Sequence, residues 1–326
     1  MQGFLKPVHD KRRLLLMLPL FSTLVFAQNG STKVEATDDT ATFRSGVVNV
    51  RIDAQVVREN ELVTNLTAAD FEIFDEGAAQ KITYFGREAE PLSLVILLDV
   101  SGSMKRYLEQ VAAVARQSLR YLQSKDQVAV MVFARNSAVR LSLSSDFDRV
   151  ATEIRSAVWD ESLGSGTNIN DALAEAARYL DTSAPENGRR AVLILTDNLG
   201  LNYRRPDDEI IQSLNSANAV LNAIVVGKGE KPEVRPGVTY RNPDFSPPDV
   251  FKIADETGGE AVKVDRAGSA FSRMIERIRT RYAIHFNKPP DATAGFRKVR
   301  VELTADARMR HPGATVRARR GYFVRN

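Results

Sequence analysis

Residues 92–104 have the sequence LSLVILLDVSGSM, and they give the clearest indication of the fold. Residues 92–98 are almost continuously apolar, which is typical of a central parallel strand that is buried on both faces. Asp99, Ser101 and Ser103 alternate along the turn that follows, so their oxygen-bearing side chains can converge. Because α/β proteins bind ligands at the carboxyl ends of their strands, the sequence predicts a binding site at this turn.

Strand and helix patterns alternate from this stretch to about residue 264. Apolar residues in 105–122 recur at helical spacing, which predicts an amphipathic helix. Further strands are expected at 128–133, 139–143 (an edge strand), 191–196, 220–226 and 261–264, and further helices at 147–158, 169–180, 208–217 and 249–256. This order predicts a doubly wound, mostly parallel sheet with helices on both faces. Residues 228–248, rich in Pro and Gly, are expected to form an irregular surface excursion.

Short strands are expected on both flanks of the α/β region. They fall at 47–54, 71–74 and 82–85 before it, and at 282–286, 297–303, 315–317 and 322–324 after a helix at 269–281. Because short strands need a sheet to join, we expect residues 46–90 and 285–326 to form one small β module. The α/β domain, residues 91–284, would then be inserted between its halves. Two separate β appendages are the alternative.

The N-terminal residues 1–27 have the pattern of a secretory signal peptide. Basic residues at 6–13 precede an apolar run at 14–26, and Ala27 supplies a small residue for cleavage. A membrane-spanning helix needs roughly 20 apolar residues, so this run is too short. An uncleaved N-terminal anchor is the alternative. Residues 28–45 are rich in Thr, Asp, Ser and Gly and are expected to form a flexible leader. The sequence therefore predicts an exported protein, located in the periplasm, on the cell surface or in the medium.

Charge and cysteine content exclude several classes of partner and site. The whole chain has a net charge of +4, and residues 1–27 hold four basic residues and one acidic residue, which leaves about +1 on the rest. Basic residues gather between 297 and 325, but Glu302 and Asp306 interrupt them and aromatic residues do not interleave. This pattern predicts a solvated face rather than a nucleic-acid groove. The chain has no cysteine, which excludes disulfides and thiolate ligands.

Two further loops are expected at the same edge of the sheet as the 99–103 turn. Residues 164–168 (GSGTN) precede a predicted helix, and residues 196–198 (TDN) follow a predicted strand. Thr167 and Asp197 would therefore add a hydroxyl and a carboxylate to the site.

These residues together resemble the von Willebrand factor type A family. Its metal-ion-dependent adhesion site is formed by a DxSxS motif, a Thr in a second loop and an Asp in a third. The five corresponding positions occur here in order as Asp99, Ser101, Ser103, Thr167 and Asp197. The resemblance covers about 92–284 and includes the Thr-Gly-Gly turn at 257–259. Asn198 departs from the family, which most often has Gly there, but Asn tolerates a left-handed backbone.

The flanks also resemble family material. Residues 66–71 (LTAADF), 75–77 (DEG) and 320–323 (RGYF) resemble segments of the type A domain proteins that are numerous in acidobacteria. The resemblance thus implies a bacterial protein whose type A domain lies within β flanks.

The resemblance implies a non-enzymatic protein-binding or adhesion module. In the family the hydroxyls bind the metal directly, one or both Asp residues act through water, and a partner's Asp or Glu fills the vacant position. Two carboxylates and three hydroxyls are hard oxygen ligands, which suit Mg²⁺ first, with Mn²⁺ or Ca²⁺ as alternatives. No nucleic-acid partner is expected, and no stable membrane span after signal cleavage.

Two other functions stay open from the sequence: a metal-dependent hydrolase and a structural, self-associating envelope component. A hydrolase needs a base near the metal, and His285 and His311, the histidines outside the predicted signal peptide, lie in the C-terminal β region. A degenerate domain whose hydroxyls only cap helices is the interpretation without a metal. Trp159, the one tryptophan, is expected to be a packing residue.

Overall fold

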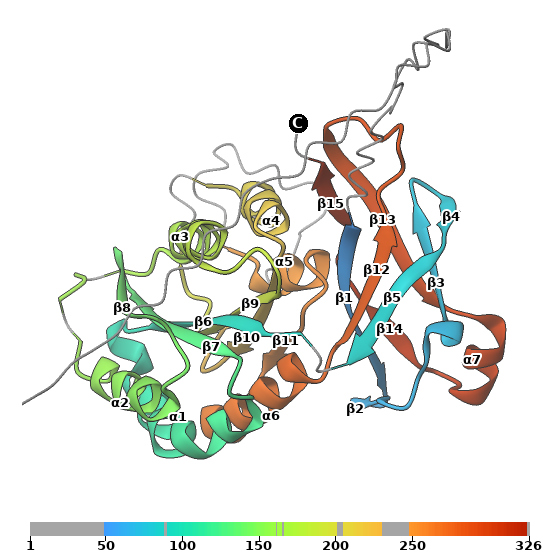
Figure 1. The fold of residues 1–326 in the computed structure, drawn as a ribbon. Helices are drawn as coiled ribbons and strands as arrows, with labels where there is room; N and C mark the ends of the chain where they lie inside the picture. The colour runs from blue at the N-terminus through green and yellow to red at the C-terminus, as the bar shows by residue number, and fades with distance from the viewer. Residues whose placement is uncertain are drawn as a thin grey trace, which may run out of the picture. The chain divides into compact units, whose positions relative to one another are not determined.

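The computed structural model, shown in Figure 1, describes residues 49–87, 90–160, 162–164, 166–200, 205–229 and 248–324. The predicted signal peptide, the predicted leader at 28–45 and most of the predicted excursion at 228–248 lie outside these residues. Within the described residues, no helix combines the length and apolarity needed to cross a bilayer.

Six described strands form the α/β sheet in the order β11-β10-β9-β6-β7-β8. They are β6 (Leu92–Asp99), β7 (Gln127–Phe133), β8 (Ser137–Ser144), β9 (Arg189–Thr196), β10 (Ala219–Val225) and β11 (Ala261–Lys263). All pairings are parallel except that of β8, which lies antiparallel to β7 at one edge. The predicted mostly parallel sheet is confirmed. The strand order reverses between β6 and β9, which is where a crevice for ligands forms in such sheets.

Helices cover both faces of this sheet, as predicted (Figure 1). One face carries α1 (Lys105–Ser118), α2 (Phe147–Ala157) and α6 (Ala267–Arg279), and the other carries α3 (Ile169–Ser183), α4 (Asp207–Ser216) and α5 (Val250–Glu256). Leu94, Ile96 and Leu98 pack into the first core, whereas Val95 and Leu97 pack into the second. All of β6 is buried because its two sets of side chains face two helical layers.

The flanking strands form two antiparallel sheets, with strand orders β14-β1-β12-β5 (β2 pairs with β1) and β15-β13-β3-β4. The elements before the α/β region are β1 (Asn49–Arg58), β2 (Glu61–Leu62), β3 (Phe71–Asp75), β4 (Ala78–Gln80) and β5 (Ile82–Arg87). Those after it are β12 (Tyr282–Asn287), β13 (Gly295–Leu303), α7 (Ala305–Arg310), β14 (Thr315–Arg317) and β15 (Gly321–Val324).

Strands from the two ends of the described chain pair directly with one another. Ile52 of β1 lies opposite Ile284 of β12, and Ile73 of β3 lies opposite Val301 of β13. These four side chains belong to one apolar core. The predicted boundary at residue 284 falls inside β12, because this strand continues to Asn287 and pairs with β1 over its whole length.

Aromatic side chains fill the core of the flanking sheets. The ring centroid of Phe71 lies 5.5 Å from that of Phe85 and 5.3 Å from that of Tyr282. The Tyr282 hydroxyl donates to the carbonyl of Val63 at 2.9 Å and accepts from the amide of Leu66 at 3.1 Å. A buried tyrosine hydroxyl needs such partners, and here they fix the segment between β2 and β3.

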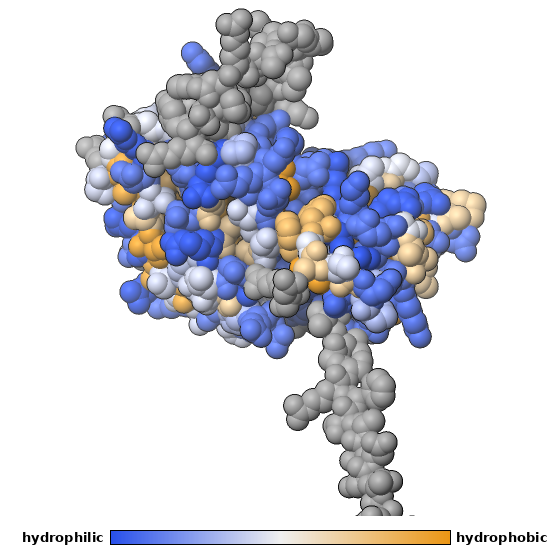
Figure 2. Space-filling view, turned by 90° about the horizontal axis from the view of Figure 1, so that it is seen from above, coloured by the Kyte–Doolittle hydropathy of each residue, from blue (hydrophilic) through white to orange (hydrophobic). Residues whose placement is uncertain are grey.

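The face drawn in Figure 2 is mostly hydrophilic, with apolar side chains in small patches. Trp159 is one of the exposed large apolar residues, with 67% of its surface accessible. The prediction that it is a packing residue is wrong, because it follows α2 in a turn and most of its surface faces solvent. Its ring instead lies under the ammonium group of Lys105, 4.1 Å from the ring centroid.

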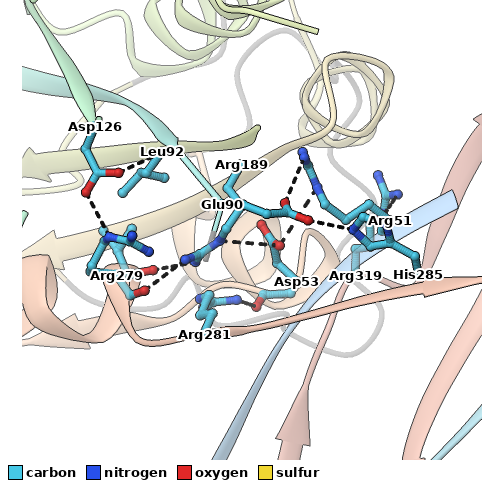
Figure 3. Close-up of polar contacts among 12 residues, drawn as sticks. Arg51, Asp53, Glu90, Leu92, Asp126, Arg189, Arg279, Arg281, His285 and Arg319 are labelled. Carbon is cyan, nitrogen blue, oxygen red and sulfur yellow. Dashed lines mark hydrogen bonds and ion pairs between the residues drawn. The ribbon is translucent and has the colours of Figure 1, made fainter. Parts of the chain in front are cut away.

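A buried network of ion pairs connects the α/β sheet to the flanking strands (Figure 3). Arg189, at the start of β9, is 1% exposed. Its Nη1 and Nη2 donate to the carbonyls of Arg279 and Ile278 at 2.8 and 2.5 Å, and its Nε lies 3.4 Å from Oδ1 of Asp53. The last carbonyls of a helix lack intrahelical partners, so this guanidinium satisfies the end of α6 while it neutralises a carboxylate of β1.

Three C-terminal arginines correct the prediction of a solvated basic face. Arg319 is only 7% exposed, Arg317 lies 2.7 Å from Glu260, and Arg297 lies 2.9 Å from Asp75. The carboxylates that pair with Arg297 and Arg317 come from distant parts of the sequence. The tertiary fold brings each arginine to its carboxylate, so no local sequence pattern could have indicated these pairs.

The network predicts how acid affects stability. Burial raises the pKa of Asp53, but the nearby charges of Arg189 and Arg51 outweigh it and hold this pKa below its usual value of 3.8. A carboxylate with a depressed folded pKa contributes stability above the unfolded pKa and loses it as the pH falls through the folded pKa. We therefore expect Asp53→Asn to be less stable than wild type at pH 7 and to lose less stability below about pH 4. Urea unfolding between pH 7 and pH 2 measures this, and parallel curves for the two proteins would contradict it.

Candidate metal centre

Asp99, the last residue of β6, is fully buried. Its Oδ1 accepts the amide of Ser101 at 3.0 Å, and its Oδ2 accepts the hydroxyl of Thr196 from β9 at 2.8 Å. The amide of Val100 donates to the carbonyl of Phe133 at 2.8 Å, so backbone pairing with β7 continues past the strand end. The carboxylate is therefore fixed by its own turn and by a neighbouring strand.

Ser101 and Ser103 follow in a turn of 3₁₀ helix that leads into α1. The amide of Met104 donates to the carbonyl of Ser101 at 2.9 Å, and the fully buried Met104 side chain anchors this turn. The two serine Oγ atoms lie 3.4 Å apart. The predicted convergence of these hydroxyls is thus present in the structure.

Asp197 follows β9, the strand that pairs with β6. Its Oδ2 accepts the hydroxyl of Ser103 at 2.6 Å, and its Oδ1 accepts the amide of Leu199 at 3.1 Å. Asn198 has a φ of 54°, so it adopts the left-handed backbone for which Gly is usual. Its amide donates to the Thr196 hydroxyl at 3.1 Å. The departure at Asn198 therefore leaves the turn intact.

Thr167 lies in the loop before α3. The amide of Asn168 donates to the carbonyl of Ala134 at 2.8 Å, which ties this loop to the end of β7. A Cβ atom on Gly200 would lie 2.7 Å from the carbonyl oxygen of Thr167, so this loop and the loop after β9 are in close contact. Thr167 is partly exposed, and no described residue forms a hydrogen bond with its hydroxyl.

The structure therefore joins Asp99, Ser101, Ser103 and Asp197 by hydrogen bonds and brings the loop of Thr167 against theirs. The carboxylates are buried, with Asp197 4% exposed, whereas Ser103 is exposed. Negative charge thus lies at the base of the site, and hydroxyl oxygens lie nearer to solvent.

Burial raises the pKa of Asp99 to about 6, and the charge of Asp197 adds to this rise. The hydrogen bonds from Ser101 and Thr196 act in the opposite direction but do not outweigh burial. Two buried carboxylates whose charges repel each other favour a cation between them. The described residues contain no group of three or more His, Cys, Asp or Glu that could hold a metal. The candidate donors are two carboxylates and three hydroxyls, a set whose chemistry fits a hard divalent cation.

Sequence reasoning missed Thr196, which is fully buried between the two carboxylate-bearing turns. It donates to Asp99 and accepts from Asn198, so one hydroxyl orients both turns. A hydroxyl residue directly before Asp197 at a strand end was the available signal, but Thr is so common in strands that it has little weight alone.

A search of curated proteins found no significant match. Solved structures that match this chain include a von Willebrand factor type A protein from Catenulispora acidiphila, 16% identical, covering 86% of this chain and 75% of that one, with a TM-score of 0.44. An aerotolerance-related membrane protein from Bacteroides fragilis is 21% identical over 57% of this chain and 98% of that one, with a TM-score of 0.44. Proximal thread matrix protein 1 from the mussel byssus, with a zinc-occupied MIDAS motif, is 18% identical over 63% of this chain and 49% of that one, with a TM-score of 0.48.

A family model described as the von Willebrand factor type A domain matches residues 94–200. This range contains all five candidate ligands, most of β6 and all of β9, the two strands between which the strand order reverses. The chain therefore carries a domain of the von Willebrand factor type A family.

Proposed function

We propose that the protein is a non-enzymatic module that holds a divalent metal and uses it to bind an acidic side chain of a protein partner. The metal ligands are Asp99, Ser101, Ser103, Thr167 and Asp197. Domains of this family usually act as interaction modules and bind protein partners. The observation that carries the proposal is the 2.6 Å hydrogen bond between Ser103 and Asp197, because it brings oxygen donors of two separate loops to one point.

Mg²⁺ is the first candidate for this site, and Mn²⁺ and Ca²⁺ share its preference for oxygen. The two carboxylates balance the charge of a divalent ion without exceeding it. A carboxylate from a partner therefore remains attractive to the metal. The histidines considered as bases lie elsewhere: His285 is in β12 next to Glu90, and His311 follows α7.

We further propose that the type A domain is inserted into a β module and that the protein is exported. Pairing of β1 with β12 and of β3 with β13 supports one β module, residues 46–90 and 285–326, into which residues 91–284 are inserted. The N-terminal sequence pattern supports export with cleavage after Ala27. The type A domain would then work outside the cytoplasm.

We expect Mg²⁺ or Mn²⁺ to stabilise the wild type and Thr167→Ala to remove this effect. A ligand at about 100 times its dissociation constant adds roughly 2.7 kcal/mol to the folded state. For a domain of about 200 residues, this corresponds to a rise in melting temperature on the order of 5–10 °C. Thermal unfolding over a range of metal concentrations measures the rise, and calorimetry measures binding directly.

The matched control is Thr182→Ala, which removes a hydroxyl at the far end of α3, whose hydrogen bonds among the described residues go to the same helix end. This variant should keep the full metal response. The metal assignment fails if wild type and Thr167→Ala melt together at every metal concentration. A second experiment immobilises the protein and compares the envelope proteins that it retains in Mg²⁺ and in chelator. If metal binds but the retained proteins are the same under both conditions, the metal site stands and the role of the metal in partner binding does not.

A further inference from the structure

A cleft of about 720 Å³ lies at the edge of the parallel sheet opposite the candidate metal centre. Its lining includes Pro91, Gly188 and Asn218, which directly precede β6, β9 and β10. Asp99 and Asp197 lie at the other ends of β6 and β9. The length of the strands therefore separates the cleft from the metal centre.

Positive charge exceeds negative charge around this cleft. Arg51, Lys288 and Arg319 contribute to its lining, together with His285. Glu90 also lines it, but its carboxylate is shared between Arg51, at 3.4 Å, and His285, at 2.8 Å. The remaining acidic residue of the lining, Glu186, is exposed to solvent.

Further arginines lie next to the cleft, gathered around Asp53 (Figure 3). Asp53 is the common counter-charge of four guanidinium groups, those of Arg51, Arg189, Arg281 and Arg319. Glu90 also faces Arg51 and Glu260 also faces Arg281, but Glu260 is shared with Arg277 and Arg317, so the arginines outnumber the carboxylates. Buried positive charge without a counter-charge is unfavourable, and an anion in the cleft would supply what is missing.

Arg319 has unused hydrogen-bonding capacity although it is 7% exposed. Its Nη1 donates to Oδ1 of Asn218 at 2.7 Å, and its Nη2 donates to the carbonyl of Arg51. Its Nε is buried and has no hydrogen-bond partner among the described residues. Burial and, to a smaller extent, the charge of Arg51 lower the pKa of Arg319 to about 10, so the group stays charged at neutral pH.

Lys288 adds a cation that no described residue neutralises. It follows β12, is half-buried and forms no ion pair with the described residues. Tyr322 and Val324 of β15 add apolar surface to the same cleft. The lining therefore combines fixed positive charge with an apolar wall.

We propose that this cleft binds a small organic anion, whose carboxylate or phosphoryl group lies against the guanidinium groups of Arg319 and Arg51 and the ammonium group of Lys288. A charged group held by two guanidinium groups is bound through planar, charge-assisted hydrogen bonds. The apolar wall contacts the uncharged part of the ligand. Nothing in this assignment depends on the metal centre.

The test uses inorganic phosphate and acetate as probes, with chloride at matched ionic strength as the reference. Calorimetry on the wild-type protein in chelator should show saturable binding of at least one of the two oxyanions. Phosphate binding alone would assign a phosphoryl ligand, and acetate binding would assign a carboxylate. Lys288→Gln should weaken the binding about tenfold, since it removes one charged donor without disturbing the buried arginines.

The control is Lys81→Gln, which removes an exposed ammonium group between β4 and β5 and should leave the binding unchanged. Lys288→Glu, which reverses the charge, should abolish it. The assignment is overturned if neither oxyanion binds saturably, or if Lys288→Gln and Lys288→Glu bind the probes as tightly as wild type. The urea midpoint of each variant checks its folding, because Lys288 is half-buried. We expect unchanged midpoints, since Lys288 forms no ion pair with a described residue.

Discussion

Gly259→Ala is expected to destabilise the α/β sheet by more than about 4 kcal/mol, which is exceptional for one methyl group. A Cβ atom at this position would lie 1.6 Å from the carbonyl oxygen of Leu221 in the middle of β10. The obstacle is backbone of a central strand, so no side chain can rotate away. The amide of Gly259 also donates to the carbonyl of Ala254 at 2.7 Å, which holds the turn in place. Urea unfolding followed by circular dichroism measures the loss of stability. In the extreme case, the variant yields no folded protein.

Gly102→Ala is the matched control for this prediction. No heavy atom lies within 4 Å of a Cβ atom built on Gly102, and its φ is not in the left-handed region. The substitution should change stability by less than about 1 kcal/mol. Equal urea midpoints for the two variants would show that the approach of the 257–259 turn to β10 is not as close as the structure has it.

Asp126→Ala is expected to lower the free energy of unfolding by about 3–5 kcal/mol. The Asp126 carboxylate is fully buried and lies 2.8 Å from Nε of Arg279, whose side chain is 2% exposed. It also accepts the amides of Leu92 and Gln123 at 2.9 and 2.8 Å. Its removal takes the Asp126 counter-charge from a buried guanidinium and this acceptor from two amides. The expected reading is a lower urea midpoint with an unchanged slope.

Two variants separate charge loss from loss of packing in this prediction. The double variant Asp126→Ala with Arg279→Met removes both charges, so it should be more stable than Asp126→Ala alone. Asp148→Ala breaks a pair with Arg116 in which both side chains are 68% exposed, and it should leave the midpoint nearly unchanged. If the double variant is the less stable of the two, the cost does not come from an unpaired buried charge.

The α/β part of the fold was predictable because its strands and helices are long enough to carry a period. The apolar run at 92–98 predicted β6, and the helical spacing at 105–122 predicted α1, which ends at Ser118 and continues as a 3₁₀ turn to Tyr121. The elements β2, β4 and α7 were not predicted. They have two, three and six residues, too few to show a period, and tertiary contacts determine them.

The candidate ligands could be named from the sequence because a motif fixes their types and order. Their supporting residues could not. Thr196 orients both acidic turns, yet it is an ordinary strand residue in sequence. Arg189 and Arg319 are buried, yet arginine in a sequence normally indicates surface. Their burial depends on carbonyls and carboxylates contributed by segments that are distant along the chain.

The pairing of β1 with β12 also determines an order of folding. Residues Ile52 and Ile284 are neighbours across the strands although the whole α/β domain separates them in sequence. Closing a loop of that length costs entropy before any contact repays it, whereas a folded α/β domain already holds its two ends together. We therefore expect β1 and β3 to wait, each paired only with its local hairpin partner β2 or β4, until the α/β domain has formed. During that interval they are open strand edges, and the nascent chain is most prone to aggregate.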